Sequence, residues 1–293
     1  MKAVRAESKK GGPWGQGARG NDDSSSGKRF RRRVMKMNPA SPPTTLELHG
    51  TRIHFPFRPY KCQEAYMTKV LEALMRKENA LLESPTGTGK TLCLLCASLA
   101  WQRQESRELE EKRLAGAAGA GSGSGASRVP TIIYASRTHS QLSQVARELQ
   151  STRYRPLHAV LGSREQMCVN PKVKKAGSTA SDINFDCNKL GKDRRCRYRN
   201  NLEGFVAPPN EEAACGAQPV MDMEDLVEMG KSMKVCPFYY TRSQVEKAEL
   251  ILMPYNYLFS KDARDTTLSD IPWDNAVVSS CAVDSFTYAN FLP

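Results

Sequence analysis

The sequence lacks any run of 18 consecutive apolar residues, so we expect no transmembrane helix and no membrane partner. It also lacks an apolar stretch near its N-terminus of the kind found in secretory signal peptides. Its nine cysteines are an odd number. Without a secretory signal, these features indicate a reducing compartment, where cysteines serve as core thiols or metal ligands rather than as disulfides.

Acidic residues are scarce at the N-terminus. The whole chain carries 43 Lys and Arg against 31 Asp and Glu, but residues 1–40 alone hold 11 basic and three acidic residues. Residues 1–44 also have few aliphatic side chains, which predicts a disordered basic tail. The basic run at residues 28–33 fits a nuclear-localisation or nucleic-acid patch, or simply a solvated tail.

Hydrophobic periodicity beyond the tail predicts alternating strands and helices, which is typical of an α/β fold with a parallel sheet. The expected helices span residues 62–75, 91–101 and 141–149, and the expected strands span residues 80–82, 131–134, 249–253 and 275–278. Residues 115–127 are almost entirely Gly, Ala and Ser, which predicts a flexible loop within this domain.

The strongest motif follows the first of these strands and precedes an apolar helix, the context that a phosphate-binding loop requires. Its glycines allow backbone N–H groups to face the phosphates, Lys90 is expected to neutralise them, and the Thr91 hydroxyl is expected to bind Mg²⁺. Ser84 stands where the common pattern has glycine. The predicted ATP-binding residues of this loop are Ser84, Pro85, Thr86, Gly87, Thr88, Gly89, Lys90 and Thr91.

Four cysteines lie in a polar, basic region between the second and third expected strands: Cys168, Cys187, Cys196 and Cys236. None of them forms the close pair that is common in zinc ribbons. Their spacing alone leaves open an iron–sulfur cluster, a zinc ion or no metal, and Cys215 competes for the fourth position. The basic residues between Lys189 and Arg199 suit a nucleic-acid backbone, or else form a solvated loop.

Several motifs together resemble the XPD-type superfamily 2 iron–sulfur DNA helicases. They are FRPYKCQ at residues 57–63, ESPTGTGKT at 83–91, ASRTHSQ at 135–141, CPFYY at 236–240 and MPYNYL at 253–258. The resemblance covers residues 46–278 and implies a RecA-like parallel sheet with helices on both faces, in residues 45–165 and 241–278. It implies an inserted iron–sulfur domain in residues 166–240. It further implies 5′-to-3′ action on single-stranded and forked DNA, in nuclear DNA repair and genome maintenance.

The resemblance also assigns roles to residues. It implies a 4Fe–4S cluster on Cys168, Cys187, Cys196 and Cys236, with the CPFYY context favouring Cys236 over Cys215. Tyr60 and Gln63 correspond to the segment that recognises adenine. The implied contacts with single-stranded DNA are Arg137, Thr138, His139 and Gln141, and the basic loop adds Arg194 and Arg195.

From Ser279 onward the chain departs from the family pattern, which continues with an Asp-Glu pair. No Asp-Glu pair occurs anywhere in the sequence, and Asp284 is a weak substitute as a metal ligand. We therefore interpret the chain as a truncated isoform, a fragment or the product of a gene-model error, inactive as a helicase on its own. The tail at 279–293 is expected to be poorly ordered or to pack in a way foreign to the family. The alternative functions are a non-catalytic module that binds nucleotide and DNA, and a different P-loop ATPase with a zinc domain.

Overall fold

The computed structural model describes residues 42–85, 87–116, 128–207, 219–261, 264, 268–269, 271, 273–283 and 286–291. Most of the predicted basic tail and of the Gly/Ser loop therefore lies outside the described residues. So do three residues named above, Thr86, Cys215 and Asp284. Among the described residues, no helix is long and apolar enough to cross a membrane.

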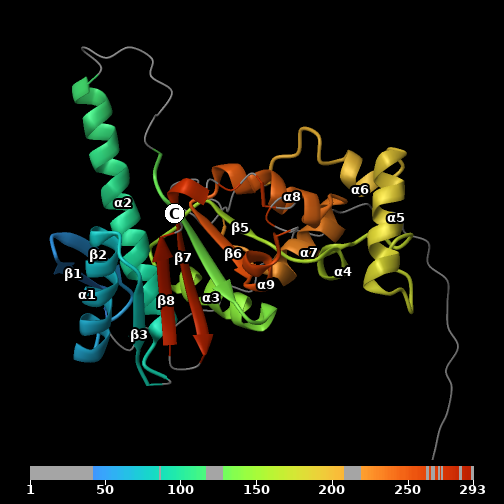
Figure 1. Cartoon of the computed structure of the whole chain (residues 1–293). Helices are drawn as coiled ribbons and strands as arrows, with labels where there is room; N and C mark the ends of the chain where they lie inside the picture. The colour runs from blue at the N-terminus through green and yellow to red at the C-terminus, as the bar shows by residue number, and fades with distance from the viewer. Residues whose placement is uncertain are drawn as a thin grey trace, which may run out of the picture. The chain divides into compact units, whose positions relative to one another are not determined.

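Figure 1 shows the arrangement of the helices and strands. The first half of the chain contains β1 (Thr44–Leu48), β2 (Thr51–Phe55), α1 (Lys61–Arg76), β3 (Ala80–Glu83), α2 (Lys90–Gly116), β4 (Thr131–Ser136), α3 (His139–Ser151) and β5 (His158–Val160). The second half contains α4 (Arg164–Met167), α5 (Ala180–Lys192), α6 (Arg197–Asn200), α7 (Met223–Met233), α8 (Pro237–Gln244), η1 (Val245–Lys247), β6 (Leu250–Pro254), α9 (Asn256–Phe259), η2 (Trp273–Asn275), β7 (Ala276–Val283) and β8 (Phe286–Phe291).

Six strands form the main sheet, in the order β3-β8-β7-β4-β6-β5. Strand β4 pairs in parallel with β6 and β7, and β5 pairs in parallel with β6. Strand β8 is antiparallel to both β3 and β7, so β3 runs in the same direction as the parallel strands. The predicted α/β class and its four predicted strands are confirmed, whereas β5 and β8 were not predicted.

The sheet is buried on both faces, because the side chains of β4 alternate between two cores. Ile132 and Tyr134 pack in a core with α1, α2 and α3. Ile133 and Ala135 pack on the opposite face with residues of η1, α9 and η2. Helices therefore cover both faces as expected, but those on the second face are short.

A two-stranded hairpin, β1–β2, precedes α1 and packs beside α2 (Figure 1). Its two-residue turn is formed by His49 and Gly50, which both have positive φ angles, 48° and 74°. This is the turn geometry that matches the twist of a hairpin. Ile53 and Phe55 then face the main core, both almost fully buried. The hairpin begins at Thr44, the last residue of the predicted tail.

The cysteine-bearing region from α4 to α8 packs partly on the main core and partly on itself. Phe238 and Cys236 belong to the main core, whereas Cys168 and Cys187 form a small cluster with Val173 and Ile183. Helices α7 and α8 approach closely at Gly230, where a Cβ atom would lie 2.7 Å from Pro237 Cδ. No larger residue fits at Gly230 without a backbone shift.

The chain beyond Ser279 forms regular structure where it is described. Strand β7 continues through to Val283, and β8 then enters the sheet between β7 and β3. Three of the six residues of β8 are aromatic, a composition that favours strands. Strand β8 thus separates β3, the strand before the phosphate loop, from β7. The expectation that this tail is poorly ordered or packs in a way foreign to the family stays a prediction.

Candidate functional site

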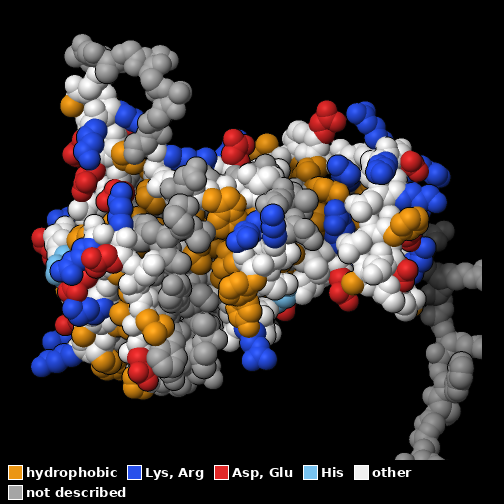
Figure 2. Space-filling view, viewed as in Figure 1, with side chains coloured by type: hydrophobic (Ala, Val, Ile, Leu, Met, Phe, Trp, Pro, Cys, Tyr) orange, Lys and Arg blue, Asp and Glu red, His pale blue; other side chains and the backbone are white. Residues whose placement is uncertain are grey.

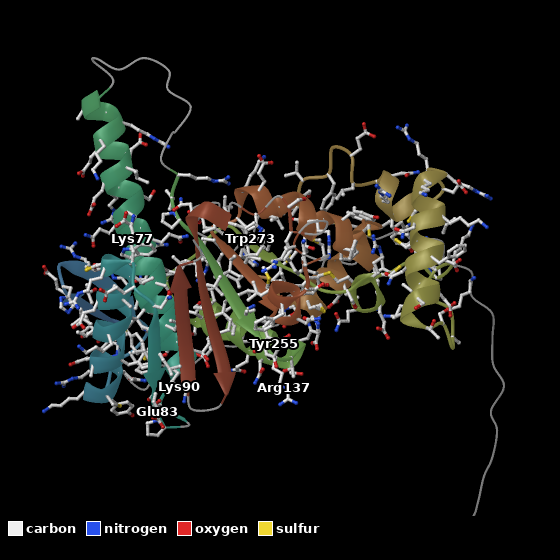
Figure 3. All side chains as sticks on the ribbon, viewed as in Figure 1. Lys77, Glu83, Lys90, Arg137, Tyr255 and Trp273 are labelled. Atoms are coloured by element: carbon white, nitrogen blue, oxygen red, sulfur yellow. The ribbon has the colours of Figure 1, made fainter. Side chains whose placement is uncertain are left out.

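The carboxyl ends of β3, β4, β6 and β7 meet at one edge of the sheet, which is where α/β proteins bind ligands. Figure 3 shows Glu83, Lys90, Arg137 and Tyr255 along this edge, and Lys77 and Trp273 away from it. The phosphate loop follows β3, and the segment beginning at Arg137 follows β4. The structure thus brings the predicted nucleotide and DNA segments to the same edge.

Two glycines give the phosphate loop its shape. Gly87 and Gly89 have φ angles of 83° and 74°, in the left-handed region that side chains disfavour. A Cβ atom on Gly89 would also lie 2.9 Å from Nε2 of Gln63. The loop continues directly into α2, whose N-terminal N–H groups favour an anion.

Lys90 is buried within this loop, with 8% of its surface exposed. Its Nζ donates hydrogen bonds to the carbonyl oxygens of Ser84, at 2.8 Å, and Pro85, at 3.0 Å. The ammonium group has three N–H donors, so one remains for a phosphate oxygen. The Thr88 hydroxyl further closes the loop by donating to the Pro85 carbonyl at 2.9 Å. Thr91 follows on the first turn of α2 and is half-buried.

Gln63 links the start of α1 to the phosphate loop. Its Oε1 accepts from the backbone N–H of Tyr60 at 3.0 Å, and its Nε2 donates to the carbonyl of Thr88 at 3.0 Å. Tyr60 itself is 70% exposed. The side chain of Gln63 thus supports the loop, and the roles of Tyr60 and Gln63 at adenine stay predictions.

The predicted DNA segment after β4 has two kinds of residue. Thr138 and Gln141 form a capping box at the start of α3, in which each side chain pairs with the other's backbone N–H. These two side chains therefore already satisfy the helix terminus. Arg137 is exposed, whereas His139 is half-buried and its pKa is lowered by burial. Within the described residues, the buried His139 Nδ1 has no hydrogen-bond partner.

All four predicted cluster cysteines are buried, with 7–9% of each residue exposed. Burial raises the pKa of Cys168, and the neighbouring thiols of Cys187 and Cys196 raise it further. Burial likewise raises the pKa of Cys236 to about 11, with added contributions from Cys196 and Cys168. The four thiols therefore lie near one another, although no three His, Cys, Asp or Glu side chains in the described part of the chain are grouped to hold a metal ion.

Each of these sulfur atoms also has an N–H donor from the chain. The backbone N–H of Asn170 donates to the sulfur of Cys168. The side-chain Nδ2 of the same residue donates to the sulfur of Cys196 at 3.5 Å. Arg164 hydrogen-bonds Cys187. Cys236 accepts from the backbone N–H groups of the two residues Phe238 and Tyr239. Such donors stabilise thiolate ligands and tune metal centres.

Arginines stack on the aromatic residues that follow Cys236. The Arg242 and Arg164 guanidinium groups lie 3.5 and 4.4 Å from the Phe238 ring centroid, and Arg199 lies 4.2 Å from that of Tyr239. Sequence reasoning assigned no role to Arg164 and Arg242, and it placed Arg199 in the basic run suited to a nucleic-acid backbone. The predicted DNA contacts Arg194 and Arg195 are exposed between α5 and α6, away from the segment after β4 in the sequence.

The family model of the DEAD_2 domain matches residues 134–279, from β4 to β7. The matched segment is just under half of the chain. It contains the four cysteines and the segment after β4, whereas the phosphate loop precedes it.

Curated relatives extend the similarity beyond the DEAD_2 domain. The chain is 45% identical over 243 residues to regulator of telomere elongation helicase 1 of Mus musculus, which covers 76% of this chain and 20% of that protein. It is 43% identical over 256 residues to a homolog of that helicase in Oryza sativa subsp. japonica, which covers 79% of this chain and 24% of that protein. The chain therefore spans about a fifth to a quarter of the length of these relatives.

Two solved structures are similar to the chain at lower identity. One is an XPD helicase, with 21% identity and a TM-score of 0.46. The match covers 76% of this chain and 32% of the chain of that structure. A truncated XPD matches 73% of this chain with 22% identity and a TM-score of 0.43, and covers 50% of that chain.

Proposed function

We propose that this chain is the nucleotide-binding part of an ATP-dependent 5′-to-3′ DNA helicase that acts in nuclear genome maintenance, including telomere maintenance. The observation that carries the proposal is the loop from Ser84 to Thr91 at the carboxyl edge of the sheet. The sequence similarity to telomere elongation helicases supports the same activity.

ATP fits the loop through charge and backbone donors. Lys90 has one N–H left for a β- or γ-phosphate oxygen, and the N-terminus of α2 adds positive potential. The Thr91 hydroxyl would bind Mg²⁺, as in other phosphate loops. The exposed ring of Tyr60, at the N-terminus of the helix that holds Gln63, is available to the adenine base.

A 4Fe–4S cluster fits the four cysteines better than a single zinc ion does. Zinc draws its sulfur ligands to about 2.3 Å from one centre, whereas a cluster takes each thiolate on a different iron. The four cysteines are well separated along the chain, and none of them forms the close pair that is common in zinc ribbons. The N–H donors from Asn170 and Arg164 suit thiolate ligands. The cluster would stabilise the fold of the α4–α8 region when bound.

Single-stranded DNA is the proposed polymer substrate. Arg137 is exposed at the carboxyl edge of the sheet, where the phosphate loop also lies. Arg194 and Arg195 are exposed on the cysteine-bearing region. Contacts of this kind with phosphates provide affinity without sequence preference. Forked DNA is also a proposed substrate, because one of its single-stranded arms could contact both groups of arginines.

A second candidate, a binding module that lacks catalysis, is favoured by one feature of β7. Ser279 and Ser280 stand in that strand beside Tyr134 and Ala135 of β4, and no Asp-Glu pair occurs in the sequence. Hydrolysis needs acidic residues to hold Mg²⁺ and to position water. We therefore propose that the 293-residue chain binds ATP and DNA but does not unwind duplex.

Binding of a fluorescent ATP analogue tests the proposal. Lys90→Ala is expected to abolish binding, because the buried ammonium charge is lost. Lys112→Ala is the matched control, since Lys112 lies on the exposed end of the same helix. Equal affinity in wild type and Lys90→Ala would exclude the loop as the nucleotide site.

A further inference from the structure

The ends of β4 and β6 are joined side by side at the carboxyl edge of the sheet. Ser136 pairs with Pro254 in the parallel register, so the next residues, Arg137 and Tyr255, are neighbours across the two strands. The backbone N–H of Tyr255 donates to the Ser136 carbonyl at 3.0 Å. Figure 3 shows both labelled side chains at this edge. The segment that carries Tyr255 is thus fixed beside Arg137.

Phe259 lies one helical turn after Tyr255 and is 79% exposed. The two rings pack edge to face, with centroids 5.9 Å apart and planes at 73°. The short helix α9 holds them through backbone hydrogen bonds from Leu258 to Tyr255 and from Ser260 to Asn256. A largely exposed phenylalanine held by an ordered aromatic neighbour is a preformed stacking surface.

The same short helix has one aromatic ring that points elsewhere. Tyr257 hydrogen-bonds Arg242, a residue of α8 that is itself largely enclosed by protein. Tyr255, Tyr257 and Leu258 pack on the core of the second sheet face, so Tyr255 is half-buried and Phe259 is the largely exposed ring of the pair. The exposure of Phe259 is therefore not a general property of α9, because its neighbours are used for packing.

Basic residues neighbour this aromatic pair, although the sequence after Phe259 interleaves them with Asp262 and Asp265. Arg137 is exposed on one side, and the exposed residues Lys261 and Arg264 follow Phe259 in the chain. In the area where Figure 1 draws α9, Figure 2 shows hydrophobic side chains next to Lys or Arg side chains. Aromatic rings beside basic side chains are the composition that binds single-stranded nucleic acid.

We propose that Tyr255 and Phe259 form a stacking platform for a base of single-stranded DNA, with Arg137 contacting an adjacent phosphate. The inference rests on the DNA-binding part of the proposed function and names the side chains that receive the bases. Single-stranded DNA is favoured over a protein partner because the platform is continuous with the basic residue Arg137 at the ligand-binding edge. Stacking on these rings accepts any base, since every base has a flat π surface.

The test compares two labelled strands of equal length, oligo-dT and an abasic strand that has the same phosphates but no bases. Wild type is expected to bind oligo-dT more tightly. Phe259→Ala should weaken oligo-dT binding by about 5-fold or more, the size of one base–aromatic stack, and leave abasic binding unchanged. Phe185→Ala on α5, which removes another exposed phenylalanine, should change neither. Phe259→Trp should restore the preference for oligo-dT.

Three results separate the possibilities. Wild type that binds neither strand would contradict the DNA-binding function and the platform together. Wild type that binds DNA, with Phe259→Ala unchanged towards oligo-dT, would overturn the platform alone. A variant altered only in self-association, measured by sedimentation, would assign the surface to a second copy of the chain and also overturn it. Equal unfolding temperatures of wild type and Phe259→Ala verify that the variant is folded.

Discussion

The side-chain amide of Gln63 donates a 3.0 Å hydrogen bond to the backbone carbonyl of Thr88, and so ties α1 to the phosphate loop. Gln63 is only 4% exposed, and its other amide atom accepts from the Tyr60 N–H. A Cβ atom on Gly89 would collide with the same Nε2. The shape of the loop therefore depends on a residue 25 positions earlier in the chain.

Gln63→Ala is expected to weaken ATP and GTP binding to a similar degree. The variant removes the part-buried hydrogen bond to the Thr88 carbonyl, which is worth about 0.5–1.5 kcal/mol, and so loosens the loop under the phosphates. Fluorescence titration with analogues of both nucleotides measures the effect.

Gln144→Ala is the control for Gln63→Ala, because Gln144 is exposed on α3 and its side chain donates a hydrogen bond to Glu148, far from the phosphate loop in the sequence. A loss confined to ATP would contradict the loop role and assign Gln63 to the adenine base instead.

Cys236→Ser is expected to abolish a broad visible absorbance of the anaerobically purified protein and to lower its iron content. The variant removes one of the four buried thiols, and cluster binding contributes directly to the stability of the α4–α8 region. Absorbance, iron analysis and thermal unfolding measure the three consequences.

Cys62→Ser should leave these signals unchanged, because Cys62 is exposed on α1. Cys215→Ser should also have no effect. Stoichiometric zinc with no visible absorbance in wild type would contradict the iron–sulfur assignment, and a loss in Cys215→Ser alone would mean that Cys215 is the fourth ligand.

The buried thiol of Cys93 predicts a loss of stability at alkaline pH. Burial raises the pKa of Cys93 to about 12, from an ordinary value of 9.0. Above pH 9 the unfolded chain therefore releases a proton that the folded chain keeps, and the free energy of unfolding falls as the pH rises towards 12.

In Cys93→Ala this contribution is absent. Between pH 9 and 11 the free energy of unfolding of the variant should therefore fall less steeply than that of wild type, by up to about 1.4 kcal/mol per pH unit. Urea unfolding at a series of pH values measures it, and the difference between the proteins at pH 7 reports packing alone. Parallel pH profiles for wild type and Cys93→Ala would contradict the predicted ionisation.

Local patterns were sufficient to predict the central elements. The apolar spacing of α1, the buried first half of α2 and the apolar run Ile132–Ala135 of β4 each have a clear period or run in the sequence. The loop at Lys90 was predicted for the same reason, since its glycines and lysine are consecutive. Residues 103–113 also carry a charged helical pattern, and the structure joins them to the apolar helix before them as the second half of α2.

The missed elements depend on long-range pairing or are too short to show a period. Strand β5 has three residues, and β8 is fixed by pairing with β3, some 200 positions earlier. The β1–β2 hairpin did carry a signal, because residues 51–55 alternate after Gly50. Such short alternations are weak in the absence of a known partner strand.

The missed site residues are defined by three-dimensional neighbours rather than by motifs. Arg164 and Asn170 reach sulfur atoms 23 and 26 positions away. Phe259 is a candidate because its ring is largely exposed and packs against that of Tyr255. No periodicity in the sequence indicates this exposure. An arginine four residues before Cys168 was the one sequence signal that could have suggested a contact with the cysteines.

The most direct test of the account is strand separation by the purified 293-residue protein, measured on a forked DNA in the same sample that binds the ATP analogue. We expect saturable nucleotide binding that Lys90→Ala abolishes, and no ATP-dependent separation. Hydrolysis needs acidic residues that hold Mg²⁺ and position water, and the sequence has no Asp-Glu pair. Robust ATP-dependent separation that Lys90→Ala abolishes would contradict the account, and would direct attention to Asp284 as a substitute acid.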